Sequence, residues 1–169
     1  EKQRGIVNHE EFVATFRSHL PAVSKFLTRR VDRSDVEDLA ADIFEIAWRK
    51  RSGCPTGMEL AWLYKIAGFV VANHRRKVSR RGLNLALNDT DAAAPSAEDL
   101  ALGTSGVSAA FAGLQASDRQ LLSLLVFESL SVKEISVALG ISENTASQRL
   151  KRARERLAKK LQAQLSDNE

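Results

Sequence analysis

Apolar residues recur at three- and four-residue intervals along most of the chain, and this spacing predicts helices. One such run is Phe12, Phe16, Leu20, Val23 and Leu27, whose members fall on one face of an α-helix. No segment combines alternating apolar and polar residues with an Asn-Gly or Asp-Gly turn, which is the pattern of a β-hairpin. We therefore predict an all-α fold.

Helix starts are marked by a recurring Ser/Thr-x-x-Glu/Gln pattern. In such a capping box, the hydroxyl and the carboxylate or amide each accept a hydrogen bond from a backbone N–H at the helix start. The pattern occurs at Ser34/Glu37, Thr56/Glu59, Ser117/Gln120 and Ser131/Glu134. We expect a helix to begin at each of these places.

Charge divides the chain into three parts. Its 169 residues include 25 Lys or Arg and 21 Asp or Glu, for a net charge of +4. Residues 1–81 carry +6, residues 82–106 carry −4 with no basic residue, and residues 107–169 carry +2. Shifts in composition mark domain boundaries. We predict two small helical domains, 1–81 and 107–169, joined by a flexible acidic linker with a short helix near Ser96–Leu102.

Several classes of protein are excluded by composition. No apolar run reaches the roughly 18 residues that a membrane-spanning helix needs, so we expect a soluble, cytoplasmic protein. The single cysteine, Cys54, cannot form an internal disulfide and has no second thiol for a zinc site. It is an incidental thiol or a redox sensor, and the sequence leaves both interpretations open. We expect no metal site and no cofactor.

The segment SVKEISVALGISENTASQRLKRARERL, which starts at Ser131, has the pattern of a helix-turn-helix. A short capped helix is interrupted at Gly140, a residue suited to the left-handed conformation that ends helices. Ser142 then caps a longer helix. Ala146 and Leu150 fall on its apolar side, while short polar and basic side chains fall opposite, as reading of the DNA major groove requires. An ordinary helical hairpin with a solvated face is the weaker alternative.

The stretch ELAWLYKIAGFVVANHRRKVSRR predicts a second helix with two distinct faces. One face is aliphatic, and the other interleaves Trp62 and Phe69 with Lys65 and basic residues. Aromatic rings stack on unpaired bases while cations follow phosphates, so this face suits single-stranded or distorted DNA. Packing of both aromatics against a neighbouring helix explains the pattern about equally well.

A third helix, in SDVEDLAADIFEIAWRKR, is predicted to carry acids along one side. Asp35, Asp38, Asp42 and Glu45 share this side, opposite an apolar face. Acids in a first turn favour the helix dipole, but this does not account for Asp42 and Glu45. An acidic face suggests a protein partner. Acid–base catalysis would need a nucleophile, a glycine-rich loop or a histidine partner nearby, and we expect no enzymatic activity.

With these motifs in order, the chain resembles the bacterial extracytoplasmic-function sigma factors, a two-domain group of the sigma family. The resemblance rests on DVEDLAADIF with the following AWR, on WLYKIA with ANHRR, and on the helix-turn-helix ending RARERL. It implies a transcription initiation factor that binds core RNA polymerase and promoter DNA, and it implies an anti-sigma factor as a further partner. The linker is implied to thread the polymerase channels.

The resemblance also implies roles for individual residues. Docking on the clamp helices of the polymerase largest subunit is implied for Asp35, Asp38, Leu39, Asp42, Glu45, Trp48 and Arg49. Binding and opening of the minus-ten element is implied for Trp62, Lys65, Asn73, Arg75, Arg76, Arg80 and Arg81, with the loop Ser52–Gly57 before them. Reading of the minus-thirty-five element is implied for Asn144, Thr145, Ser147, Gln148, Lys151 and Arg152, in a domain that also contacts the polymerase flap.

Two other functions remain open from the sequence. The chain could be a helix-turn-helix regulator that binds duplex DNA without polymerase, or a helical scaffold whose basic faces are only solvated. A regulator of the first kind is expected to protect a palindrome as a dimer, because two-fold protein symmetry matches a palindromic site.

Overall fold

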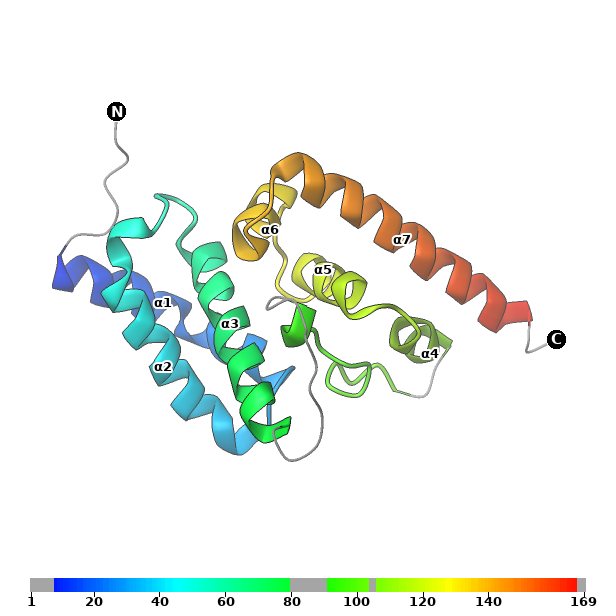
Figure 1. Ribbon diagram of the computed structural model, residues 1–169, viewed down its shortest axis with the longest axis horizontal. Helices are drawn as coiled ribbons and strands as arrows, with labels where there is room; N and C mark the ends of the chain where they lie inside the picture. The colour runs from blue at the N-terminus through cyan, green and yellow to red at the C-terminus, as the bar shows by residue number, and fades with distance from the viewer. Residues whose placement is uncertain (1–7, 80–90, 104–105, 167–169) are drawn as a thin grey trace.

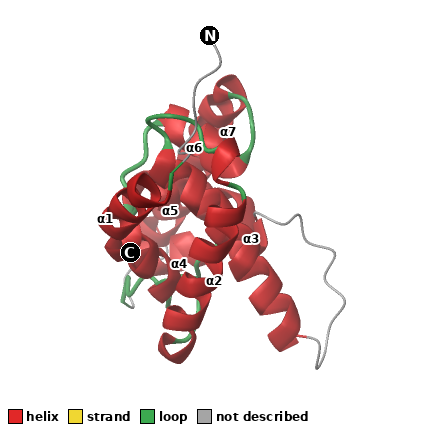
Figure 2. Cartoon of the chain, turned by 90° about the vertical axis from the view of Figure 1, so that its left-hand side faces the viewer, coloured by secondary structure: helices red, strands yellow, loops and turns green. Residues whose placement is uncertain are grey.

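The computed structural model describes residues 8–79, 91–103 and 106–166, and within these ranges every regular element is helical (Figure 2). The all-α prediction is confirmed. The helices form an N-terminal group and a C-terminal group, which lie side by side in Figure 1. The N-terminal group comprises α1 (His9–Thr28), α2 (Val36–Arg49) and α3 (Glu59–Ser79). The C-terminal group comprises α4 (Gly106–Ala112), α5 (Ala116–Val126), α6 (Val132–Leu139) and α7 (Glu143–Ser166).

Three single turns of 3-10 helix complete the described elements: η1 (Arg33–Asp35), η2 (Arg51–Gly53) and η3 (Asp91–Ala93). The described helices include none with the combined length and apolar character that crossing a membrane requires.

The capping pattern is confirmed at Ser131/Glu134 and is wrong at two other sites. Ser131 Oγ accepts a hydrogen bond from the Glu134 N–H, and the Glu134 carboxylate accepts one from the Ser131 N–H at 2.7 Å. Ser34 lies inside η1, and no side chain caps α2. Ser117 lies inside α5, which begins one residue earlier. A hydroxyl inside a turn of helix cannot occupy the N-cap position, so the pattern has no capping role there.

At the Thr56/Glu59 pattern, α3 begins at Glu59 itself. The Glu59 carboxylate accepts a hydrogen bond from the Gly57 N–H at 2.8 Å, and this bond ties the loop backbone to the first residue of α3. The predicted helix start is present, close to its expected position.

The main hydrophobic core is shared by both helical groups. The N-terminal group contributes fully buried residues such as Phe26, Ile43 and Leu63, and the C-terminal group adds Leu124 and Ile135 to the same cluster. The two groups meet where α3 packs against α6. Of the apolar run predicted for α1, Phe12, Phe16, Val23 and Leu27 are buried, whereas Leu20 is 43% exposed. Periodic spacing therefore predicted most of this buried face and was wrong at Leu20.

The described part of the acidic linker, residues 91–103, packs between the groups. Ala93 is fully buried in the shared core, and Leu100 joins a smaller cluster beneath α7. The short helix expected near 96–102 is a single turn in the structure. Ser96 and Asp99 cap this turn reciprocally, and Ala101 then adopts a φ of 51°, a left-handed conformation that ends a helix.

Candidate nucleic-acid and partner-binding faces

The helix-turn-helix predicted from Ser131 onward is present as α6, a turn and α7. Gly140 ends α6 with a φ of 65° and a ψ of 35°, the left-handed conformation that its identity predicted. Ser142 then caps α7, because its Oγ accepts the Thr145 N–H at 3.1 Å. Ala146, Leu150 and Ala153 are buried, and they fix which side of α7 faces the rest of the molecule.

The opposite side of α7 faces solvent. Thr145 is half-buried, and its Oγ1 accepts a hydrogen bond from the Ser142 hydroxyl at 2.7 Å. The other predicted reading residues are exposed, namely Asn144, Ser147, Gln148, Lys151 and Arg152. Amide, hydroxyl and basic groups on one exposed helix face can donate to base edges and to phosphates in a major groove.

The predicted minus-ten residues on α3 lie in different environments. Trp62 is 9 % exposed and packs edge-on against Phe16, with ring centroids 6.4 Å apart. Phe69, in contrast, is 40 % exposed. The core-packing interpretation therefore holds for Trp62 and not for Phe69. Arg80 and Arg81 lie outside the described residues.

Lys65 and Arg75 face the C-terminal group and the linker. A β-carbon at Gly140 would lie 3.4 Å from Lys65 Cε and Nζ, so the Lys65 side chain covers the turn between α6 and α7. Arg75 donates to the carbonyls of Ala92 and Ala94, each at 2.7 Å. The Lys65 and Arg75 side chains therefore both contact other residues of this chain.

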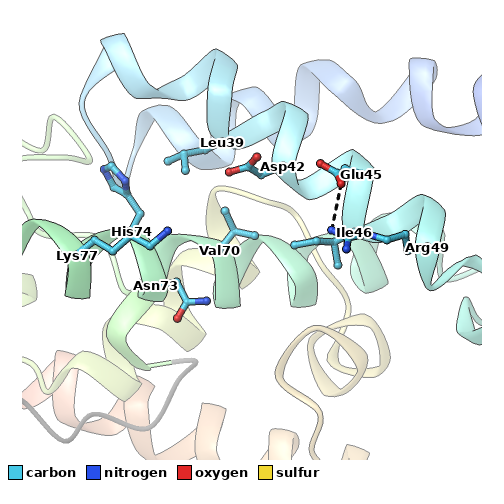
Figure 3. A pocket seen from close by; sticks show the side chains of 9 residues that line it. All are labelled: Leu39, Asp42, Glu45, Ile46, Arg49, Val70, Asn73, His74 and Lys77. Atoms are coloured by element: carbon cyan, nitrogen blue, oxygen red, sulfur yellow. Dashed lines mark ion pairs between the residues drawn. The ribbon is translucent and has the colours of Figure 1, made fainter.

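Asn73 and Arg76 are exposed near the end of α3 and belong to a separate surface. Asn73 lines a groove between α3 and α2 (Figure 3). The groove is lined by Leu39, Asp42, Glu45, Ile46, Arg49, Val70, Asn73, His74 and Lys77. Acids from the predicted polymerase face and polar residues from the predicted minus-ten face therefore share one groove.

The acidic face of α2 is exposed at its centre. Asp38, Asp42 and Glu45 face solvent, and Glu45 forms an ion pair with Arg49 at 3.2 Å (Figure 3). Asp35, at the start of the helix, pairs with His74 Nε2 at 3.2 Å. Surface pairs of this kind add little stability, so the acids remain available to a partner.

Two residues assigned to the α2 face by the resemblance belong partly to the core. Leu39 is buried. Trp48 is half-buried against Phe12, with ring centroids 4.9 Å apart, and the Arg51 guanidinium lies 3.8 Å above its ring. Packing therefore orients α2 through Leu39 and Trp48, while the acids project outward.

Cys54 is buried after η2 and is 4 % exposed. Burial, with a contribution from the Glu59 carboxylate, raises the pKa of its thiol to about 11. Because the thiolate is the reactive form, this environment favours an inert thiol over a redox sensor.

Comparison with family models decides which family this architecture represents. Residues 15–81 match the model for sigma-70 region 2, and residues 107–157 match the model for sigma-70 region 4. Together the two matches cover well over half of the chain, in the order of the two helical groups. The chain belongs to the sigma-70 family. It is a sigma factor, and the region 4 match contains α6, the turn and α7 as far as residue 157.

Two solved structures have the same fold as this sigma factor. One is the sigma factor RpoE in complex with the anti-sigma factor NepR from Bartonella quintana, with 22% identity and a TM-score of 0.60 over 91% of this chain and 98% of that one. The other is CnrH in complex with the cytosolic domain of CnrY, with 21% identity and a TM-score of 0.58 over 92% of this chain and 90% of that one. No curated protein matches the sigma factor.

A polar cluster that the sequence did not predict lies between regions 2 and 4 of the sigma factor. Glu128, in the loop between α5 and α6, accepts hydrogen bonds from Arg29, Arg30 and Tyr64. Burial and the neighbouring Glu128 raise the pKa of the Tyr64 hydroxyl well above its ordinary range. Burial lowers the pKa of Arg30 to about 10, with Glu128 opposing the shift, and Arg30 stays charged at neutral pH. A lone acid within LLSLLVFESL is the one sequence signal that marks this site.

Proposed function

We propose that this sigma factor belongs to the extracytoplasmic-function group, binds core RNA polymerase in the cytoplasm and directs it to a class of promoters. The observation that best supports the proposal is the exposed polar face of α7, which lies opposite its buried apolar face. This helix belongs to a chain that contains both region 2 and region 4. The division into 1–81, 82–106 and 107–169 is part of this proposal.

Region 4 is proposed to read the minus-thirty-five element as duplex. The start of α7 enters the major groove, where Asn144, Ser147 and Gln148 reach base edges. Lys151 and Arg152 lie about one to two turns of α7 beyond these residues, where they contact phosphates and set the register of α7 on the DNA. Thr145 supports the cap of α7 beside these residues.

Region 2 is proposed to bind the minus-ten element and hold it open. Exposed Asn73 and Arg76 contact DNA at the end of α3, with Arg80 and Arg81 following in the chain. Lys65 and Arg75 are proposed to join them after the two regions separate. Trp62 is assigned to this face by the family resemblance, and its burial against Phe16 supports a role in positioning α3.

The acidic face of α2 is proposed to dock on the clamp helices of the polymerase largest subunit. Exposed Asp38, Asp42 and Glu45 support this assignment, because charge complementarity steers association and fixes register. Asp35 and Arg49 flank the acids, and buried Leu39 and half-buried Trp48 hold the helix in place. Region 4 is proposed to contact the polymerase flap, as the family resemblance implies. An anti-sigma factor is proposed as a regulator, because RpoE, a structure of similar fold, was solved in complex with the anti-sigma factor NepR.

Footprinting with reconstituted holoenzyme tests the proposal against a polymerase-independent regulator. Core polymerase with this chain is expected to protect two separated elements on selected genomic fragments, and the chain without polymerase is expected to leave these fragments unprotected. Protection of a palindrome by a dimer of the chain alone would favour the regulator and contradict the proposal.

A further inference from the structure

A buried cluster of charged side chains joins the two regions. The Glu128 side chain is 2% exposed and that of Arg30 is fully buried. Glu128 Oε1 accepts from Arg29 Nη1 at 3.1 Å and from Arg30 Nη1 at 3.3 Å, while Oε2 accepts from the Tyr64 hydroxyl at 3.4 Å. The Glu128 carboxylate of region 4 therefore contacts two residues that directly follow α1 and one residue near the start of α3.

Every donor direction of Arg30 is occupied. Besides Glu128, its guanidinium donates to the Phe26 carbonyl within α1, to Ala93 of the linker, and to Gln120 and Ser123 of α5. The distances lie between 2.8 and 3.2 Å. A guanidinium has five N–H donors, and Arg30 uses them to connect region 2, the linker and region 4 at a single point.

The neighbouring linker residues, 91–95, form a strap that two further arginines hold by its backbone. Arg75 Nη1 donates to the carbonyls of Ala92 and Ala94, and its Nε and Nη2 donate to the Arg30 carbonyl at 3.2 and 2.8 Å. Arg119 donates to the Pro95 carbonyl at 3.1 Å. The guanidinium of Arg75, a proposed minus-ten residue, therefore donates its hydrogen bonds to carbonyls of the strap and of Arg30.

We propose that Glu128, Arg29, Arg30 and Tyr64 form a latch that holds regions 2 and 4 closed on the strap, and that the latch must release before Arg75 and Lys65 reach DNA. The second clause rests on the proposed function of α3. The α7 face remains exposed while the latch is closed, so the latch withholds the minus-ten residues and leaves the minus-thirty-five residues free.

The chemistry of the latch suits a reversible contact. Desolvation of two charges offsets much of their attraction in a buried ion pair, and all four latch side chains can be hydrated once the regions separate. Loss of one partner, however, leaves an uncompensated buried charge in the closed form. Small changes at Glu128 are therefore expected to shift the closed-to-open ratio strongly.

The chain offers a matched control for Glu128. Asp118, at the start of α5, is also a buried carboxylate, and both of its oxygens accept from Arg156 Nη1 at 2.9 Å. This pair lies within region 4, between α5 and α7. Glu128→Gln and Asp118→Asn each remove one negative charge from a buried carboxylate that pairs with arginine, but only Glu128 belongs to the latch.

The first test measures the distance between regions by fluorescence energy transfer in the full chain. Dyes are placed at Ala14→Cys on α1 and Ala158→Cys on α7, both exposed positions, with Cys54→Ser to leave two thiols. Glu128→Gln is expected to lower the closed-to-open ratio about a hundredfold or more, with a longer distance between dyes and unchanged helical circular dichroism. Asp118→Asn is expected to keep the wild-type distance.

A second variant protects the test against a local folding defect at Glu128. Arg29 has a side chain that is 23% exposed, so Arg29→Glu is expected to leave region 2 folded while placing two acids together at the latch. It is expected to open the chain as Glu128→Gln does, although the two changes alter net charge in opposite directions. A wild-type distance in both variants would overturn the latch.

Binding of a short mixed-sequence single-stranded DNA then tests the consequence for α3. Glu128→Gln is expected to bind it at least about tenfold more tightly than wild type or Asp118→Asn, and adding Arg75→Ala is expected to remove the gain. An open Glu128→Gln chain that shows no gain would support the latch and contradict the assignment of Arg75 to the minus-ten element. The two failures are therefore distinguishable.

Discussion

Cys54 shows how a single environment decides the chemistry of a residue. The sequence placed this thiol in a loop and left redox sensing open. The fold buries it and places it near Glu59, and both effects disfavour the thiolate. A raised pKa also means that the thiol form is favoured by folding, so its contribution to stability is present at neutral pH and is lost as pH rises toward 11.

We predict that Cys54 alkylates slowly in the native protein. At pH 8 a pKa of about 11 leaves about one thiol in a thousand ionised, so native modification by iodoacetamide should be at least about a hundredfold slower than in denaturant. Mass spectrometry of timed samples measures both rates. Similar rates in the native and denatured protein would restore the redox-sensor interpretation.

Gly140 is a residue that the sequence assigned correctly. Its φ of 65° is the left-handed conformation that the break between two helical patterns predicted. We predict that Gly140→Ala destabilises the protein by about 1 kcal/mol, because the methyl group is strained at this φ and meets Lys65 at 3.4 Å.

Thermal unfolding checks this expectation, with a fall in Tm of about 2–4 °C. Gly53→Ala is the control, since Gly53 has an ordinary φ and open space around its α-carbon. If Gly140→Ala were as stable as Gly53→Ala, the turn would not require glycine.

At the scale of elements, the periodic pattern predicted both faces of α7, and the structure confirms the buried one. Ala146, Leu150 and Ala153 are buried as expected. Element boundaries were predicted less well, since a Ser-x-x-Glu or Ser-x-x-Gln spacing occurs inside helices as well as at their starts. Ser117 and Gln120 fit the pattern, yet Gln120 faces inward and accepts from Arg30.

The α7 face gives a prediction about salt dependence. Lys151→Ala or Arg152→Ala should weaken duplex minus-thirty-five binding and reduce the slope of log K against log salt by about 0.9, because one phosphate contact is lost. Fluorescence anisotropy of a minus-thirty-five duplex, titrated with reconstituted holoenzyme over a salt series, measures the slope.

Lys159→Ala is the matched control for this measurement. Lys159 is also exposed on α7, but lies about 12 Å farther along the helix than Lys151, beyond the proposed groove contact. An unchanged slope for both Lys151→Ala and Arg152→Ala, or an equal loss in Lys159→Ala, would place the reading face elsewhere.

At the scale of the whole molecule, the sequence separated the charges but did not predict how the two regions meet. Periodicity identifies a buried face without naming its partner, and Arg29 and Arg30 resemble ordinary basic residues at a helix end. Glu128 is charged and lies in a loop, where solvent exposure is the usual expectation. Glu128 pairs with Arg29 and Arg30 across almost one hundred positions and with Tyr64 across 64, separations that local patterns cannot indicate.

The acidic face of α2 gives a prediction about assembly. Asp38→Lys with Asp42→Lys should reduce affinity for core polymerase at least about tenfold, because both acids are exposed and their reversal opposes a basic partner surface. Glu143→Lys with Glu155→Lys makes the same charge change at exposed positions on α7, outside region 2. Co-elution with core polymerase compares the pairs, and equal assembly would refute the docking assignment.

Promoter-dependent run-off transcription with purified core polymerase and this chain tests the proposed function most directly. Templates are chosen from the fragments that the holoenzyme protects. We expect a discrete transcript with the wild-type chain, a weaker one with Lys151→Ala, and no transcript without the chain. Absence of a chain-dependent transcript on every protected fragment would contradict the proposal that this sigma factor directs polymerase to promoters.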